Sequence, residues 1–286
     1  LKEIADKYNS LQSALAGAER LVPLLEEEDR QIANEVPREF KHIESIDFKH
    51  VWFSYDNNDV YALEDFTLSI KTGEFIGIVG PSGSGKSTLL SLLMGLYKPT
   101  KGAIYINGID IANYDSSVLR HLMGYVFQQA YLFKGSIKDN LTLFDTSISY
   151  DDMVAAAKQV NLDSMIEQLP EGYHTPVGYL GSLLSDGQKQ LLAFGRTLIR
   201  NTPILLLDEA TANIDSHTEK QIQASIENIR GSKTIVSIAH RLSTVQDANK
   251  IVYMEYGKII EKGSFEELIN SKGAFYNLWS NQQSGS

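Results

Sequence analysis

The sequence feature that most constrains the fold is a glycine-rich loop between an apolar run and a leucine-rich segment. The loop fits the pattern G-x-x-x-x-G-K-[ST] and reads Gly80-Pro81-Ser82-Gly83-Ser84-Gly85-Lys86-Ser87-Thr88. Residues 75–79 before it suit a buried parallel strand, and leucines follow it at a helical period from 89 to 96. This order of strand, loop and helix predicts an α/β fold with a mostly parallel sheet.

The residue types in this loop favour phosphate binding. Glycines let several backbone N–H groups turn towards one anion, and the N-terminus of the following helix adds its positive end. Lys86 can reach terminal phosphates, and the Ser87 hydroxyl can bind Mg²⁺. The sequence therefore predicts a site for a nucleoside triphosphate.

Composition narrows the classes of function that remain. Hydrophobic residues make up 43% and charged residues 22% of the 286, which is typical of a soluble globular protein, and we expect neither a membrane span nor a secretory signal. The net charge of −10 argues against nucleic acid as a partner, because phosphate backbones bind basic surfaces. The absence of cysteine excludes disulfides, thiolate metal sites and cysteine nucleophiles.

Polar residues follow two further strand-like runs. Asp208 and Glu209 end the apolar run that begins at Ile204, and His240 follows the run 234–238. If the first run lies beside the strand of the glycine loop, Asp208 sits near the metal of Mg-ATP. Glu209 can then orient or deprotonate an attacking water. The alternatives are a solvated acid pair and an ordinary strand-end histidine.

Two other segments carry weaker signals. Leu184–Gln188 precedes a helix predicted at 189–199, and it reads either as a plain N-cap and turn or as a second anion site. Residues 1–35 carry one apolar stripe at helical spacing, which fits a surface helix or a helix that packs on a partner.

The motifs in this order resemble the nucleotide-binding domain of ABC (ATP-binding cassette) transporters, from about residue 40 onward. The signature of that family is L-S-G-G-Q, and 184–188 match four of its five positions. The resemblance implies a P-loop NTPase (RecA-like) core with an antiparallel β subdomain and an inserted α-helical subdomain at about 130–196. It assigns 36–286 to the ATPase domain and 1–35 to the cytoplasmic extension of a last transmembrane helix plus a linker.

The resemblance also implies a role for each site residue. It makes Glu209 the catalytic base and places His240 at the γ-phosphate, with Lys86 and Gln128 completing the catalytic set. It assigns Mg²⁺ to Ser87, Gln128 and Asp208. Besides the loop 80–88, the residues that it implies for ATP contact are Tyr55, which stacks on adenine, and Gln128, Ser185, Gly187, Gln188 and Asp215.

Within this family, segments 131–137 and 169–173 are similar to exporter half-transporters. The resemblance implies that ATP joins two such domains head to tail at the cytoplasmic face of a membrane, and that this powers export. The implied partners are the transmembrane domain of the same transporter chain and a second ATPase domain, identical or different, with no nucleic acid. An importer ATPase, a soluble non-transport ABC ATPase and a metabolite kinase are the alternatives.

One departure from the family pattern suggests an unequal pair. Asp186 replaces the first glycine of the signature and puts a negative charge where the phosphates of a partner should dock. The residues of the glycine loop and the carboxylates at 208 and 209 are intact. We therefore hypothesise a heterodimeric exporter in which this chain supplies the catalytic residues of one site and a weakened signature to the other.

Overall fold

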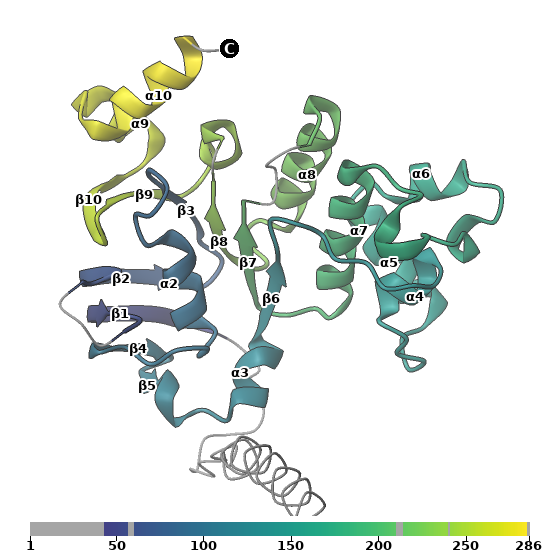
Figure 1. The fold of residues 1–286 in the computed structure, drawn as a ribbon, viewed down its shortest axis with the longest axis horizontal. Coiled ribbons are helices and arrows are strands. Elements are labelled where there is room, and N and C mark those ends of the chain that lie inside the picture. Colours follow the sequence, from purple (N-terminus) through teal and green to yellow (C-terminus); the bar gives the residue numbers. More distant parts are fainter. Residues whose placement is uncertain (1–42, 57–59, 210–213, 240, 285–286) are drawn as a thin grey trace, which may run out of the picture.

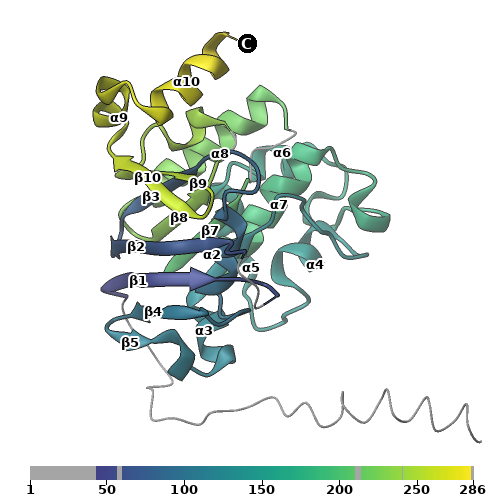
Figure 2. The same cartoon turned by 60° about the vertical axis from the view of Figure 1, so that its left-hand side comes forward.

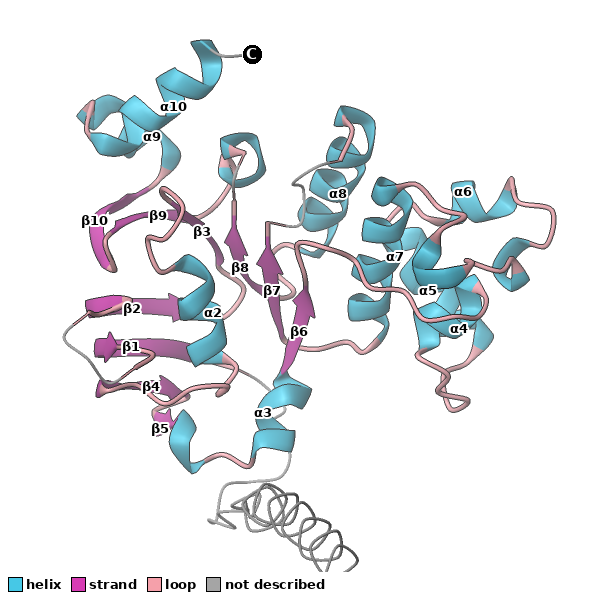
Figure 3. Cartoon of the chain, viewed as in Figure 1, coloured by secondary structure: helices cyan, strands magenta, loops and turns pink. Residues whose placement is uncertain are grey.

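The computed structural model describes residues 43–56, 60–209, 214–239 and 241–284. The apolar stripe predicted within 1–35 and the predicted site residue His240 lie outside these ranges. In the described part, strands and helices follow one another from the glycine loop onward, with a group of helices between β6 and β7 (Figure 3). No helix in these ranges combines the length and the apolar character that a membrane crossing requires.

A six-stranded sheet forms the centre of the molecule, with strand order β10-β9-β3-β8-β7-β6 (Figure 1). Neighbouring strands pair in parallel, except that β9 and β10 form an antiparallel hairpin at one edge. The strands are β3 (Phe75–Val79), β6 (Met123–Val126), β7 (Ile204–Asp208), β8 (Thr234–Ile238), β9 (Lys250–Glu255) and β10 (Lys258–Gly263). The mostly parallel sheet predicted from the glycine loop is confirmed.

A second, antiparallel sheet has strand order β2-β1-β4-β5 and lies beside the first (Figure 2). Its strands are β1 (Ser45–Phe53), β2 (Leu63–Lys71), β4 (Lys101–Ile106) and β5 (Ile109–Asp110). The strands of this sheet alternate between buried and exposed side chains; β2, for example, buries Leu63, Phe66, Leu68 and Ile70. This alternation is typical of an antiparallel sheet with one face on the core and the other exposed to solvent.

Each face of the central sheet packs on a different hydrophobic core. Alternate residues of β7 separate onto the two faces: Ile204 and Leu206 join the antiparallel sheet and helix α2 (Lys86–Leu93), whereas Leu205 and Leu207 join the helical side. Because both faces are covered, β3, β7 and β8 are apolar almost throughout. The helix of the glycine loop therefore lies on the face of the antiparallel sheet.

Helices extend from the β6 edge of the central sheet and form the end of the molecule opposite the antiparallel sheet (Figure 1). They are α4 (Ile137–Thr142), α5 (Tyr150–Gln159), α6 (Asp163–Glu167) and α7 (Asp186–Ile199), and α8 (Ser216–Ile229) packs beside α7. Helix α3 (Ser116–Leu122) leads into β6, and α9 (Phe265–Ser271) and α10 (Ala274–Ser284) close the chain.

The structure decides three details that the sequence analysis left open or placed differently. Strand β7 does not lie beside β3, because β8 separates them. Strand β1 ends at Phe53, so Tyr55 lies in a bend beyond it. The helix predicted from 189 begins at Asp186, because Ser185 already caps it with a reciprocal bond to Gln188.

Candidate nucleotide-binding site

The glycine loop curls around the ammonium group of Lys86. The loop leaves β3 at Gly80 and enters α2 after Gly85, and these glycines have φ of +147° and +97°, conformations that L side chains rarely adopt. Lys86 Nζ donates to the carbonyl oxygens of Gly80, 2.9 Å away, and Pro81, 2.8 Å away. The loop thus holds a cation at its centre, with the N-terminus of α2 directly behind it.

The charge of Lys86 is both desolvated and balanced. The residue is only 8% exposed, and this burial lowers the pKa of its ammonium group below the ordinary value. The nearby carboxylates of Glu209 and Asp208 act in the opposite direction on that pKa. The buried ammonium group can form strong charge-assisted bonds with phosphate, whereas the two carboxylates favour a cation beside it.

Asp208, at the end of β7, reaches towards the glycine loop although β8 lies between their strands. Its Oδ1 lies 3.5 Å from the Ser87 hydroxyl on α2. Its Oδ2 accepts a hydrogen bond of 2.7 Å from the hydroxyl of Tyr125 on β6. The alternate residues Ile204, Leu206 and Asp208 lie on one face of the sheet. Helix α2 crosses this same face, which makes the contact with Ser87 possible.

Glu209 leaves the strand in a left-handed conformation, with φ of +48°. Its backbone N–H donates to the carbonyl of Ile238 at the end of β8, 3.0 Å away. Its side chain accepts a 2.7 Å bond from Nε2 of Gln128, in the segment after β6. This conformation is uncommon for a residue with a long side chain, and such backbone outliers gather at functional sites.

Lys86, Gln128 and Glu209 share one cavity of about 520 Å³ at the carboxyl edge of the central sheet, the edge at which α/β proteins bind ligands. Its described lining includes residues from the glycine loop, from the segments after β6, β7 and β8, and from α10: Gly80, Pro81, Ser82, Lys86, Gln128, Glu209, Ala239, Arg241, Leu278 and Gln282. The sequence analysis predicted the first six of these but none of the last four.

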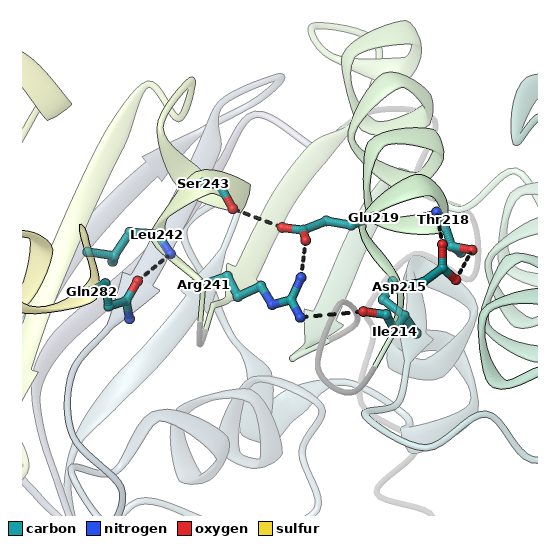
Figure 4. Close-up of polar contacts among 8 residues, drawn as sticks. All are labelled: Ile214, Asp215, Thr218, Glu219, Arg241, Leu242, Ser243 and Gln282. Carbon is teal, nitrogen blue, oxygen red and sulfur yellow. Dashed lines mark hydrogen bonds and ion pairs between the residues drawn. The ribbon is translucent and has the colours of Figure 1, made fainter. Parts of the chain in front are cut away.

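A polar network ties the wall of this cavity to α8 (Figure 4). Arg241 forms an ion pair with Glu219 in the first turn of α8 and donates to the carbonyl of Ile214, 3.4 Å away. The Ser243 hydroxyl donates to the other carboxylate oxygen of Glu219 at 2.8 Å. Glu219 is 8% exposed, so its charge is nearly buried but fully partnered.

The C-terminal helix joins the same network from the other side. The side-chain oxygen of Gln282 accepts a 3.2 Å bond from the backbone N–H of Leu242, as Figure 4 shows. Leu278 and Gln282 of α10 both line the cavity.

Tyr55 lies near the glycine-loop helix but is not among the described residues that line the cavity. Its hydroxyl is hydrogen-bonded to that of Thr88 at 3.0 Å, and its ring packs edge-to-face on Phe53 and Tyr97. The residue is 53% exposed, so about half of its surface remains accessible to a ligand.

The signature segment does not join the cavity within the described part of the chain. Ser185 is exposed and caps α7, accepting from the N–H of Gln188 at 3.2 Å while Gln188 accepts from the N–H of Ser185 at 2.9 Å. Asp186 forms an exposed ion pair with Lys189. Asp215 accepts two bonds from Thr218 at the start of α8.

Gly187 explains how α7 and α8 approach each other at the signature segment. A side chain at this position would lie 2.5 Å from the Thr218 hydroxyl, so only glycine allows the two helices to pack this closely. The same contact brings the signature segment next to the Asp215 segment.

The structure thus gathers Lys86, Ser87, Asp208, Glu209 and Gln128, and it leaves Ser185, Gly187, Gln188 and Asp215 on a separate surface. Sequence reasoning missed Tyr125, Glu219 and Arg241. Tyr125 stands out as the one hydroxyl in an otherwise apolar strand, which is a signal for a polar contact at that position. Glu219 and Arg241 carried no comparable signal.

Comparison with known proteins agrees with this geometry. The ABC transporter family model matches residues 63–212. The chain is 40% identical over 283 residues to the uncharacterized ABC transporter ATP-binding protein YfiC of Bacillus subtilis, covering 99% of this chain and 47% of YfiC. It is 36% identical over 282 residues to the ATP-dependent lipid A-core flippase of Syntrophus aciditrophicus, covering 97% of this chain and 46% of the flippase.

A solved structure shows the same fold. The structure of a bacterial Atm1-family ABC exporter with ATP bound superposes with a TM-score of 0.86 at 36% identity, over 96% of this chain and 48% of the exporter chain. The chain therefore spans about half the length of the relatives that it matches. The family match, together with the glycine loop and the carboxylates that face it, shows that the chain belongs to the ABC transporter family and carries its ATP-binding domain.

Proposed function

We propose that this chain is the ATP-binding and ATP-hydrolysing domain of an ABC exporter, and that it acts at the cytoplasmic face of a membrane. The observation that carries the proposal is the cavity in which the Lys86 loop faces Glu209 and Gln128. The similarity to a lipid flippase and to an Atm1-family exporter supports export over import. Residues 1–35 would link the domain to the transmembrane part of the same transporter chain.

The donor set beside the glycine loop fits Mg²⁺. Magnesium prefers oxygen ligands, commonly one or two carboxylates and the phosphates of the substrate. The Ser87 hydroxyl and Asp208 Oδ1 are such ligands and lie 3.5 Å apart. These two residues, with Gln128 nearby, would hold Mg²⁺, which neutralises charge on the phosphates when it is bound.

The other residues bind and orient the reactants. The backbone of the loop and Lys86 would hold the phosphates, and the face of Tyr55 would stack on adenine. Glu209 would orient and deprotonate the attacking water, which is the work of a general base. The bond from Gln128 to Glu209 supports this role, because it fixes the carboxylate while leaving Oε1 free of that bond.

Glu209→Gln tests the catalytic assignment. The substitution removes the base but keeps the size of the side chain, so we expect ATP affinity to stay within about twofold while the turnover rate falls at least ~100-fold. The matched control is Glu255→Gln, which changes a glutamate at the end of β9 in the same sheet. Nucleotide binding by calorimetry and phosphate release are the measurements.

Two results would contradict the proposal. Turnover that survives in Glu209→Gln would remove Glu209 from the role of base. Loss of turnover in Glu255→Gln to the same degree would mean that the effect comes from the fold of the sheet and not from the site.

For the partner, we infer that the Ser185–Gln188 segment, in which Ser185 and Asp186 are exposed, completes the site of a second ATPase domain. The segment lies outside its own cavity, on the surface next to Asp215. The ion pair of Asp186 with Lys189, 2.9 Å long, offsets the negative charge, but an exposed pair does so only in part. We therefore keep the proposal of a weakened signature and a heterodimeric partner.

A further inference from the structure

Tyr125 and Asp208 lie on one face of the central sheet. Strands β6 and β7 run in parallel, and Tyr125 stands opposite Leu206 in the register. Asp208 is two residues further along β7, so its side chain points to the same face as that of Leu206. The register therefore places the phenol of Tyr125 diagonally next to the carboxylate of Asp208, on the face that carries α2.

The two carboxylate oxygens of Asp208 have different neighbours. Tyr125 donates to Oδ2 at 2.7 Å, a short bond of the kind that an ionised acceptor makes. Oδ1 is turned towards the Ser87 hydroxyl at 3.5 Å. With Oδ2 fixed in this way, the carboxylate cannot rotate about its bond to Cβ without losing the phenol, so Oδ1 stays aimed at Ser87.

The phenol is itself held in place. Tyr125 is half-buried, and its ring packs on Phe127 with a centroid distance of 4.4 Å. A tyrosine hydroxyl ordinarily keeps its proton at neutral pH, so the phenol is the donor in its bond to Asp208. Three residues further on, Gln128 makes the corresponding bond to Glu209, so one short segment orients both carboxylates at the end of β7.

We propose that Tyr125 is a positioning residue that orients the Asp208 carboxylate for the divalent cation bound together with ATP. The proposal rests on the proposed function, because it assumes that Asp208 and Ser87 hold Mg²⁺. Groups that orient metal ligands by hydrogen bonds typically change metal affinity by about 10–100-fold when they are removed. In this proposal Tyr125 acts through its hydrogen bond to Asp208.

Tyr125→Phe deletes one oxygen and keeps the ring that packs on Phe127. The matched control is Tyr253→Phe, because Tyr253 also donates to a carboxylate of the same sheet, Oε1 of Glu255 at 2.6 Å. Mn²⁺ serves as the probe: its free signal in electron paramagnetic resonance, titrated with each full 286-residue chain and a non-hydrolysable ATP analogue, gives the dissociation constant of the cation. Circular dichroism sets a temperature at which all variants are folded.

We expect Tyr125→Phe to raise the Mn²⁺ dissociation constant about 10-fold and Tyr253→Phe to leave it unchanged. Affinity for the nucleotide without a divalent cation should stay the same in all variants, which a general loss of structure would not allow. Equal Mn²⁺ affinity in wild type and Tyr125→Phe would overturn the inference and leave the proposed function standing. Failure of the wild type to bind Mn²⁺ with the nucleotide would instead refute the proposed metal site.

Discussion

At the scale of single residues, Tyr55 makes two kinds of contact, one through its hydroxyl and one through its ring. Its hydroxyl holds Thr88 at the end of the glycine loop, while its ring leans edge-on against Phe53 and Tyr97. Both rings stand nearly perpendicular to that of Tyr55, and the residue is still 53% exposed. The proposed stacking on adenine therefore depends on the ring and not on the hydroxyl.

Two substitutions at this position separate ring from hydroxyl. Tyr55→Ala should weaken ATP binding by about 1–3 kcal/mol, the usual contribution of stacking on one base, because it removes the π-face. Tyr55→Phe should restore most of that affinity, since it loses only the bond to Thr88. Calorimetric titration with ATP is the measurement. If Tyr55→Phe binds ATP as weakly as Tyr55→Ala, the hydroxyl and not the ring is responsible for the affinity.

At the scale of elements, the Glu219 carboxylate joins the start of α8 to the segment after β8. Arg241 and Ser243 both bind it, and Arg241 also reaches Ile214, which precedes α8 (Figure 4). Arg241 lines the cavity, so this contact fixes one wall of the nucleotide site relative to the surface that carries Asp215.

Glu219→Gln should destabilise the fold by about 1–3 kcal/mol, because it leaves Arg241 without its charged partner in a half-buried place. The control is Glu227→Gln on the same helix, which breaks an exposed pair with Arg230 of 3.2 Å and should change stability by less than about 1 kcal/mol. Urea unfolding curves for both variants give the comparison. Equal losses would show that the buried pair contributes no more than a surface pair.

At the scale of the whole molecule, the nucleotide site and the proposed partner surface belong to different layers. The nucleotide cavity lies at the carboxyl edge of the central sheet, whereas the signature lies at the start of α7, in the helical part of the molecule (Figure 1). A single chain therefore presents one phosphate site and one exposed helix start, which is the geometry that two chains need to complete each other head to tail.

Asp186 should set the strength of that pairing. In a Glu209→Gln chain with ATP, adding Asp186→Gly should favour the dimer about 10-fold in its dissociation constant, because a negative charge beside the partner's phosphates is removed. The control Asp151→Gly removes an exposed acid from the first turn of α5 and should leave dimerisation unchanged. Sedimentation velocity measures the dimer. The same dissociation constant with Asp and Gly at 186 would contradict the weakened signature, and a monomer in every variant would contradict self-association.

Much of the fold was readable from the chain, because strand, glycine loop and helix are encoded within about twenty consecutive residues. For Ser185 the sequence offered an N-cap or an anion site as alternatives. The structure shows the reciprocal N-cap. The order β3-β8-β7 was left open, because strand order depends on contacts between segments far apart in the chain.

The sequence by itself determined the family and the chemical types at the site: a cation in a glycine loop, a hydroxyl after it, and two carboxylates after an apolar strand. Those signals are local, since backbone conformation and donor type are set by neighbouring residues. Only the tertiary structure decided that Tyr125 meets Asp208, that Gln128 meets Glu209 and that Arg241 meets Glu219. These partners lie 83, 81 and 22 residues apart in the chain, and the register and packing that join them arise only when the sheet assembles.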